Sequence, residues 1–167
     1  MRNKIKTTAD KINKISAKDI IDQSGIYEIM GIDIKKCNMP IIGVDGFSRQ
    51  TITSDPNSVG HFIFTRLQPL LEDLVKANII EQKAPFFDSE IHSIKETLAS
   101  ELSVMATQAH QISHDKDAIS GLTEKMGETP IVQLLDVTRP IIDEVNKTIS
   151  NKVRAELLKP NQVGNTL

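Results

Sequence analysis

The sequence predicts a mainly α-helical fold: an irregular bundle of four to five helices with a small β or loop insertion after the first helix. Apolar residues recur at steps of three and four over most of the chain, which places them on one face of a helix. Residues 24–55 break this pattern, because half of the eight glycines lie there between short β-branched runs. The predicted units are a basic amphipathic N-terminal helix at 1–23, a helical domain at 24–159 and a frayed C-terminal tail at 160–167.

The predicted first helix, within residues 5–23, is amphipathic and basic. Residues 1–18 hold six basic side chains against one acidic side chain, Asp10. Ser16 followed by Asp19 resembles a capping box, which indicates that the helix breaks and restarts there. Two roles stay open for this arm: a helix docked on the domain with its lysines in water, or a helix that attaches to an anionic membrane or to nucleic acid.

The segment 24–55 is expected to form a small meander of two or three strands, or a structured loop. Glycine interrupts any helical register, and isoleucine and threonine favour extended chain. Loops on a rigid scaffold are where functional residues concentrate, so this segment is the first place to look for a site. The expected extended pieces are Ile26 to Ile29, Ile32 to Ile34, Pro40 to Val44 and Thr51 to Thr53.

The second predicted helix spans 55–83, with Asp55 as its cap and Pro56 in its first turn. Pro69 interrupts its apolar face. Because proline lacks an N–H and clashes one turn back, the helix is kinked or begins anew at that point. In the second case residues 61–67 form a strand instead.

Residues 88–114 give the clearest helical pattern, with Asp88 as the expected cap. Steps of three and four repeat without error along its apolar stripe, so one face packs and the other is solvated. The stripe consists of Ile91, Ile94, Leu98, Leu102, Met105, Ala109 and Ile112.

Two further helices are predicted after residue 115. A short one at 116–126 ends at a glycine, Gly127. A long one at 129–159 begins with Thr129 as its cap and a proline at the first helical position, and Pro140 inside it predicts a kink.

Cys37 and His61 offer a candidate catalytic pair in the irregular region. A thiolate nucleophile needs a nearby base, and Asp45 or Asp55 would orient the imidazole. Such an arrangement predicts a small cysteine-dependent hydrolase or transferase. The alternative is structural, because a lone cysteine commonly serves as a small buried hydrophobic side chain.

His110 and His114 offer a candidate metal site near the end of the predicted helix 88–114. Side chains four residues apart share one helix face, so both imidazoles can bind one ion. Asp117 supplies a third ligand, and zinc is the metal that this set suits. The alternative is a pair of solvated histidines, and no other cofactor is expected.

Composition narrows the function class. Cys37 is the only cysteine, which fits a reducing compartment, and no apolar run approaches the roughly 20 residues that span a bilayer. The expected location is the cytoplasm, with delivery in an unfolded state into a host cytosol as an alternative. Aromatic residues make up only 4% of the chain and the body beyond residue 18 is acidic, which disfavours nucleic-acid binding.

Because no catalytic motif is present, the sequence favours a non-enzymatic protein–protein interaction module. An adaptor or a delivered bacterial effector that presents helical surfaces to a partner protein fits the one-sided apolar stripes. The apolar helix faces also allow a homo-oligomer. The alternatives are the cysteine-dependent enzyme and an attachment domain that uses the basic arm.

Overall fold

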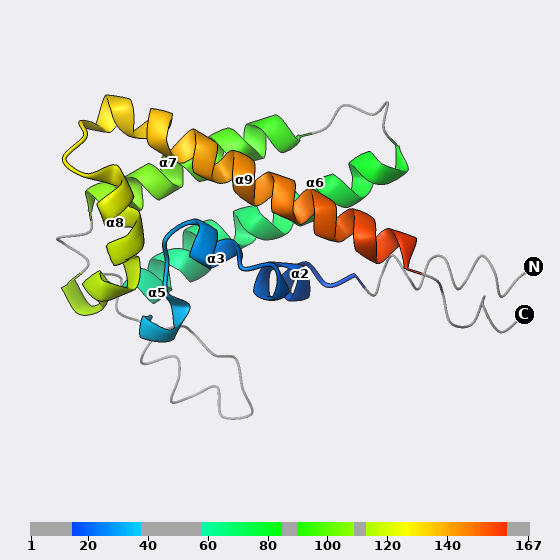
Figure 1. Cartoon of the computed structure of the whole chain (residues 1–167), viewed down its shortest axis with the longest axis horizontal. Helices are drawn as coiled ribbons and strands as arrows, with labels where there is room; N and C mark the ends of the chain where they lie inside the picture. The colour runs from blue at the N-terminus through cyan, green and yellow to red at the C-terminus, as the bar shows by residue number, and fades with distance from the viewer. Residues whose placement is uncertain (1–14, 38–57, 85–89, 109–112, 160–167) are drawn as a thin grey trace, which may run out of the picture.

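A computed structural model describes residues 15–37, 58–84, 90–108 and 113–159, and within these ranges the chain is all-α, with no strand. Its body is three long helices, α6 (Gln68–Lys83), α7 (Ile91–Thr107) and α9 (Ile131–Leu158), which pack against one another (Figure 1). Helices α7 and α9 are antiparallel: Ser103 contacts Thr138, whereas the earlier Lys95 contacts the later Asp143.

Short helical elements complete the described part of the domain. Helices α2 and α3 pack against α9, and α2 also packs against α6. The short elements are α2 (Ala17–Gln23), α3 (Ile26–Ile29), the 3-10 helix η1 (Ile34–Lys36), α5 (Val59–Phe62), the π-helical turn η2 (Ile63–Leu67), the 3-10 helix η3 (Ser113–Ile119) and α8 (Ser120–Met126).

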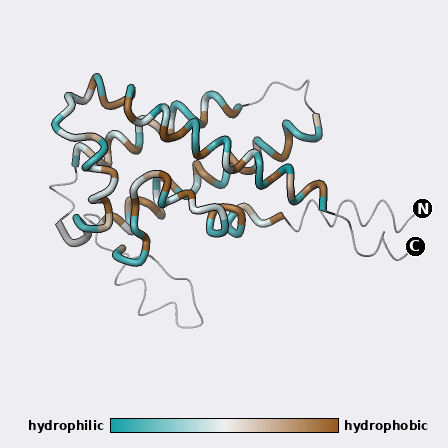
Figure 2. Tube along the Cα trace, in the orientation of Figure 1, coloured by the Kyte–Doolittle hydropathy of each residue, from teal (hydrophilic) through white to brown (hydrophobic). Residues whose placement is uncertain are grey.

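The core is built from aliphatic side chains, as expected for a chain without tryptophan. Along the long helices, hydrophobic and hydrophilic residues alternate in bands (Figure 2), so each helix buries one stripe and exposes the other. Fully buried members from the three long helices include Leu71, Leu74, Leu98, Leu102, Met105, Ile142, Val145, Ile149 and Val153.

Two polar contacts between helices are set into this core. The Ser103 and Thr138 hydroxyls lie 3.1 Å apart between α7 and α9. Asn78 of α6 donates to the Asn146 Oδ1 of α9 at 3.0 Å. Because a buried polar group without a partner is costly, these two contacts favour one relative placement of the three helices.

The chain is helical on both sides of Pro69, so the strand alternative for residues 61–67 is wrong. Helix α5, the π-helical turn η2 and α6 follow one another without a break from Val59 to Lys83. The Gln68 N–H donates to the Ile63 carbonyl five residues back, which is the π-helical pattern. The widened turn gives the proline ring room where a regular α-turn would clash.

The β insertion is not seen in the described residues. Ile26 to Ile29, expected to be extended, form the helical turn α3, and Ile34 begins η1. Burial overrides β-propensity here, because Ile26, Tyr27 and Met30 follow helical spacing and are all buried. The expected extended pieces at 40–44 and 51–53 lie outside the described residues.

Several helix boundaries differ from the predicted ones. Helix α7 ends at Thr107 rather than continuing to residue 114. Helix α9 begins at Ile131, and the Thr129 hydroxyl donates back to the Met126 carbonyl of α8 instead of capping α9. Helix α9 runs through Pro140, where a kink stays a prediction.

Other boundaries are confirmed. Ser16 caps α2 by accepting a hydrogen bond from the Asp19 N–H, and Gly127 follows the last residue of α8. The expected caps Asp55 and Asp88, and the predicted tail at 160–167, lie outside the described residues. In the described structure Ser58 caps the helix that contains α5.

Candidate functional site

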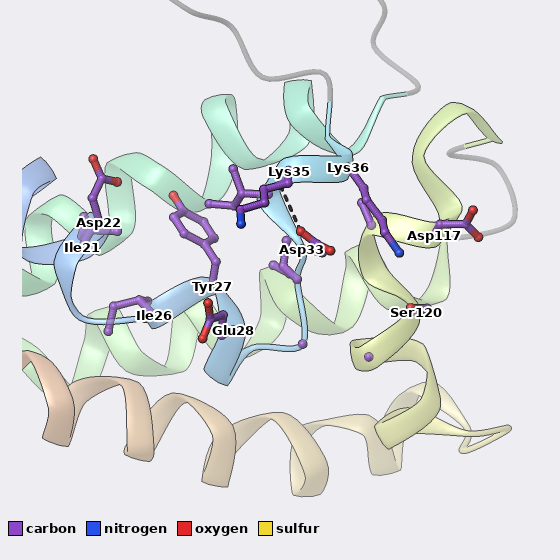
Figure 3. A pocket seen from close by; sticks show the side chains of 16 residues that line it. Ile21, Asp22, Ile26, Tyr27, Glu28, Asp33, Lys35, Lys36, Asp117 and Ser120 are labelled. Atoms are coloured by element: carbon purple, nitrogen blue, oxygen red, sulfur yellow. Dashed lines mark hydrogen bonds between the residues drawn. The ribbon is translucent and has the colours of Figure 1, made fainter.

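A cleft of about 530 Å³ lies where the segment from α2 to η1 meets η3 and α8; we call it the α3–α8 cleft (Figure 3). Its two walls are separated by about eighty residues in sequence. The lining residues are Ile21, Asp22, Gly25, Ile26, Tyr27, Glu28, Gly31, Ile32, Asp33, Ile34, Lys35 and Lys36 from the first wall, and Asp117, Ala118, Ser120 and Gly121 from the second.

The two walls are joined by backbone contacts. The Asp33 N–H donates to the Ala118 carbonyl at 2.7 Å, and the Leu122 N–H donates to the Gly31 carbonyl at 3.0 Å. Gly31 has φ of 79°, and a Cβ atom there would lie 2.4 Å from the Leu122 nitrogen. Only glycine permits this conformation and this approach, so Gly31 fixes the distance between the walls.

Lys125 adds a third connection, because its Nζ donates to the Ile29 carbonyl at 3.2 Å. That carbonyl lies at the end of α3, where carbonyl groups have no donor within the helix, so the lysine supplies one. Hydrogen bonds on both sides of Gly31 therefore connect the two walls of the cleft.

Tyr27, the single tyrosine of the chain, lines the cleft and is only 6% exposed. Burial raises the pKa of its hydroxyl well above the ordinary value, and the negative charges of Asp22 and Glu72 raise that pKa further. The phenol is therefore neutral at physiological pH and offers a hydrogen-bonding group on an apolar ring.

Six charged side chains surround the cleft, all exposed, and none of them forms an ion pair with another described residue. They are Asp22, Glu28, Asp33, Lys35, Lys36 and Asp117. The Asp33 carboxylate does accept a hydrogen bond from the Lys35 backbone N–H, which caps η1 (Figure 3).

Some charged side chains elsewhere do form ion pairs. Arg66 of η2 pairs with Glu101 of α7, Lys95 of α7 pairs with Asp143 of α9, and Arg139 of α9 makes three hydrogen bonds to Glu96 of α7. These pairs connect neighbouring elements, although exposed pairs of this kind each contribute little to stability.

The candidate thiol site is described only in part. Cys37 follows η1, is half-buried against the core, and its Sγ lies 3.5 Å from the Asp33 carbonyl oxygen. His61 lies in α5 and is half-buried, while Asp45 and Asp55 lie outside the described residues. The thiol chemistry stays a prediction.

The candidate metal site is likewise described only in part. His110 lies outside the described residues, and His114 belongs to η3, after the end of α7. One continuous helix was expected to carry both histidines, and α7 does not reach that far. Asp117 is exposed and lines the cleft, and the described residues hold no group of three or more metal-ligating side chains. A site at His110 and His114 stays a prediction.

Sequence reasoning did not single out Tyr27, Lys35 or Lys36 as site residues. A weak indication was present, because Gly25 and Gly31 bracket the one tyrosine of the chain. The second wall could not be associated with the first, since nothing in the sequence indicates the Gly31–Gly121 contact.

Among the described helices, none has the length and apolar character that a membrane span requires. Comparison with protein-family models, with curated proteins and with solved structures finds no match for the chain.

Proposed function

We propose that this domain is a non-enzymatic protein-binding module that holds a segment of a partner protein in the α3–α8 cleft. One observation carries the proposal: six charged side chains that form no ion pair with a described residue surround a concave surface with an apolar, tyrosine-containing lining. Protein interfaces commonly combine an apolar centre with a polar rim, and tyrosine is among their enriched residues.

The charges of the cleft indicate what the partner segment carries. The first wall presents Lys35 and Lys36 next to Asp33, and Asp22 and Glu28 lie on the same wall. A segment with both acidic and basic side chains matches this rim, whereas a strongly basic or strongly acidic polymer would meet repulsion from part of it. A mixed-charge protein segment is therefore the proposed ligand, and nucleic acid is disfavoured.

The connection between the walls supports a preformed site. Gly31 and Gly121 bring the backbones together, and three hydrogen bonds hold them. A rigid site loses less conformational entropy when a ligand binds, which raises affinity for a given set of contacts.

The experiment is site-specific crosslinking in a lysate of the source cells. A photo-reactive residue is placed at Lys36 in one protein and at Lys147 of α9 in another. Lys147 is a matched control, because it too is exposed and forms no ion pair with a described residue. The proposal predicts a discrete crosslinked protein at Lys36 that is absent at Lys147. The same crosslinks from both positions, or none from Lys36, would contradict it.

The cysteine-dependent enzyme stays as the alternative function. Replacing Cys37 with alanine separates the two, because a thiol enzyme loses its activity and a binding module keeps its partner. The membrane or nucleic-acid attachment of the arm has no support from the described residues, since residues 1–14 lie outside them.

A further inference from the structure

A second hollow, of about 410 Å³, lies among the three long helices and away from the α3–α8 cleft; we call it the α6–α7–α9 hollow. Helix α9 contributes Asn146, Ser150 and Arg154, which are spaced by four residues and therefore share one face of the helix. The remaining lining residues are Asn78, Glu81 and Gln82 of α6 and Ile91, His92 and Lys95 of α7.

The orientation of the Asn146 amide follows from its neighbours. Asn78 is 3% exposed, and its Nδ2 donates both to the Leu74 carbonyl at 2.8 Å and to Asn146 Oδ1 at 3.0 Å. A backbone carbonyl can only accept, so the Asn78 nitrogen must face it, and Asn146 must present its oxygen to Asn78. The Asn146 Nδ2 is thereby left to donate elsewhere, and it has no acceptor among the described residues.

Ser150 and Arg154 continue this row of donors. The helical hydroxyls of Thr97, Thr107 and Thr148 each donate to the carbonyl four residues back. Ser150 makes no such bond within the described structure, and Arg154 forms no ion pair there, although Lys152 on the same helix does. Three successive donors of one helix face therefore lack acceptors among the described residues.

The charged side chains that line the hollow are Glu81, Lys95 and Arg154. Lys95 pairs with Asp143 at 2.8 Å, so these two charges offset each other. With Lys95 offset in this way, Arg154 supplies the positive charge that remains to face an anion, and Glu81 is the one carboxylate among the lining residues. Donors from Asn146, Ser150, Arg154 and His92 outnumber acceptors, which is the composition of an oxyanion site.

We propose that the α6–α7–α9 hollow binds a small oxyanion, a phosphate or carboxylate group, through Asn146, Ser150 and Arg154. Arg154 supplies the charge and a planar fork of N–H donors, and the fixed Asn146 amide and the Ser150 hydroxyl supply directional hydrogen bonds. This site is independent of the partner segment proposed for the α3–α8 cleft.

The test is a titration of the full chain, followed by amide NMR, with inorganic phosphate, acetate or chloride at matched ionic strength. The proposal predicts saturable shifts around residues 146–154 with phosphate, acetate or both, and none with chloride. A response to one oxyanion alone identifies the group that binds. Equal shifts with all three salts, or no saturation, would overturn the proposal, because that behaviour is screening rather than binding.

Three variants localise the site. Arg154→Gln should weaken binding about tenfold or more, because it removes a charge-assisted hydrogen bond. Lys147→Gln, which removes the same charge from an exposed position of α9 outside the hollow, should leave the affinity unchanged. Equal weakening by both substitutions, or none by Arg154→Gln, would contradict the assignment. Ser150→Ala gives a second, uncharged check and should weaken binding without changing the net charge.

Discussion

Replacing Gly31 with alanine should disrupt the close backbone contact between the two walls of the α3–α8 cleft. The residue has φ of 79°, and an added Cβ would lie 2.4 Å from the Leu122 nitrogen and 2.7 Å from the Gly121 carbonyl carbon. Both neighbours are backbone atoms, which cannot rotate away as a flexible side chain can. The walls must therefore separate, or the left-handed conformation must be abandoned.

The expected loss of stability can be worked from these contacts. A left-handed conformation costs alanine about 1–2 kcal/mol relative to glycine. Separation of the walls also weakens the hydrogen bonds from Leu122 to Gly31 and from Asp33 to Ala118, each worth about 0.5–1.5 kcal/mol. Together these effects lower the free energy of unfolding by about 3 kcal/mol, which is large for a single methyl group.

Gly25→Ala is a matched control for the same experiment. Gly25 also has a left-handed conformation, with φ of 64°, yet the nearest atom to an added Cβ is the Glu28 Oε2 at 3.7 Å, an ordinary contact with a flexible side chain. This substitution should therefore cost only the conformational part, about 1–2 kcal/mol. Urea unfolding followed by far-ultraviolet circular dichroism measures both variants. If Gly31→Ala destabilises the protein no more than Gly25→Ala does, the wall contact does not have the role assigned to it.

Three further predictions concern single side chains. Asn78→Ala should lower the free energy of unfolding by about 1–3 kcal/mol in urea titrations, because it removes a buried hydrogen bond to Asn146. The control Asn151→Ala, at an exposed position of α9, should change the free energy of unfolding by less than about 0.5 kcal/mol. Equal effects of the two substitutions would argue against the Asn78–Asn146 contact. Tyr27 should ionise at a higher pH than free tyrosine in an ultraviolet absorbance titration, because its folded-state pKa is raised. The stability that the buried neutral phenol contributes to the fold is present below pH ~10 and is lost as the pH rises above the unfolded-state pKa. Ionisation at the ordinary pKa while the chain is still folded would contradict the burial of Tyr27. Cys37→Ala should leave capture of the crosslinked partner unchanged, and loss of capture in a folded variant would favour a direct role for the thiol.

Local sequence patterns predicted the helical body well, since each depends on residues a few positions apart. The stripe from Ile91 to Met105 has the spacing of a one-sided helix, and its Leu98, Leu102 and Met105 are buried in α7. Gly127 ends α8, and Ser16 caps α2, for equally local reasons. Such features are readable because the hydrogen bonds that fix them lie within the same short segment.

Features that depend on distant contacts were not predictable in the same way. Ile26 and Ile29 have high strand propensity, yet α3 is helical because helical spacing buries Ile26, Tyr27 and Met30 together. The core against which α3 packs decided this outcome, and sequence spacing does not identify that core. Thr129 is a different case, because its hydroxyl bonds to the Met126 carbonyl only three residues back, so one local bond replaced another.

The two proposed sites were missed for the same physical reason. The α3–α8 cleft joins residues 21–36 to residues 117–121, and the α6–α7–α9 hollow joins three helices. In the α6–α7–α9 hollow, the donor side chains at positions 146, 150 and 154 follow helical spacing, but nothing in the sequence shows that this helix face lies beside Asn78 rather than in solvent. The sequence directed attention to Cys37 with His61 and to His110 with His114, whose chemistry stays untested.

If the charged rim of the α3–α8 cleft holds a partner protein, reversing the positive charges of the rim must weaken the affinity for that partner. Lys35→Glu with Lys36→Glu changes the rim, and Lys76→Glu with Lys147→Glu makes the same change in net charge at exposed positions of α6 and α9. Titration calorimetry with the partner identified by crosslinking should show affinity about three- to tenfold weaker for the first variant and unchanged for the second. Equal affinities for both variants would contradict the claim.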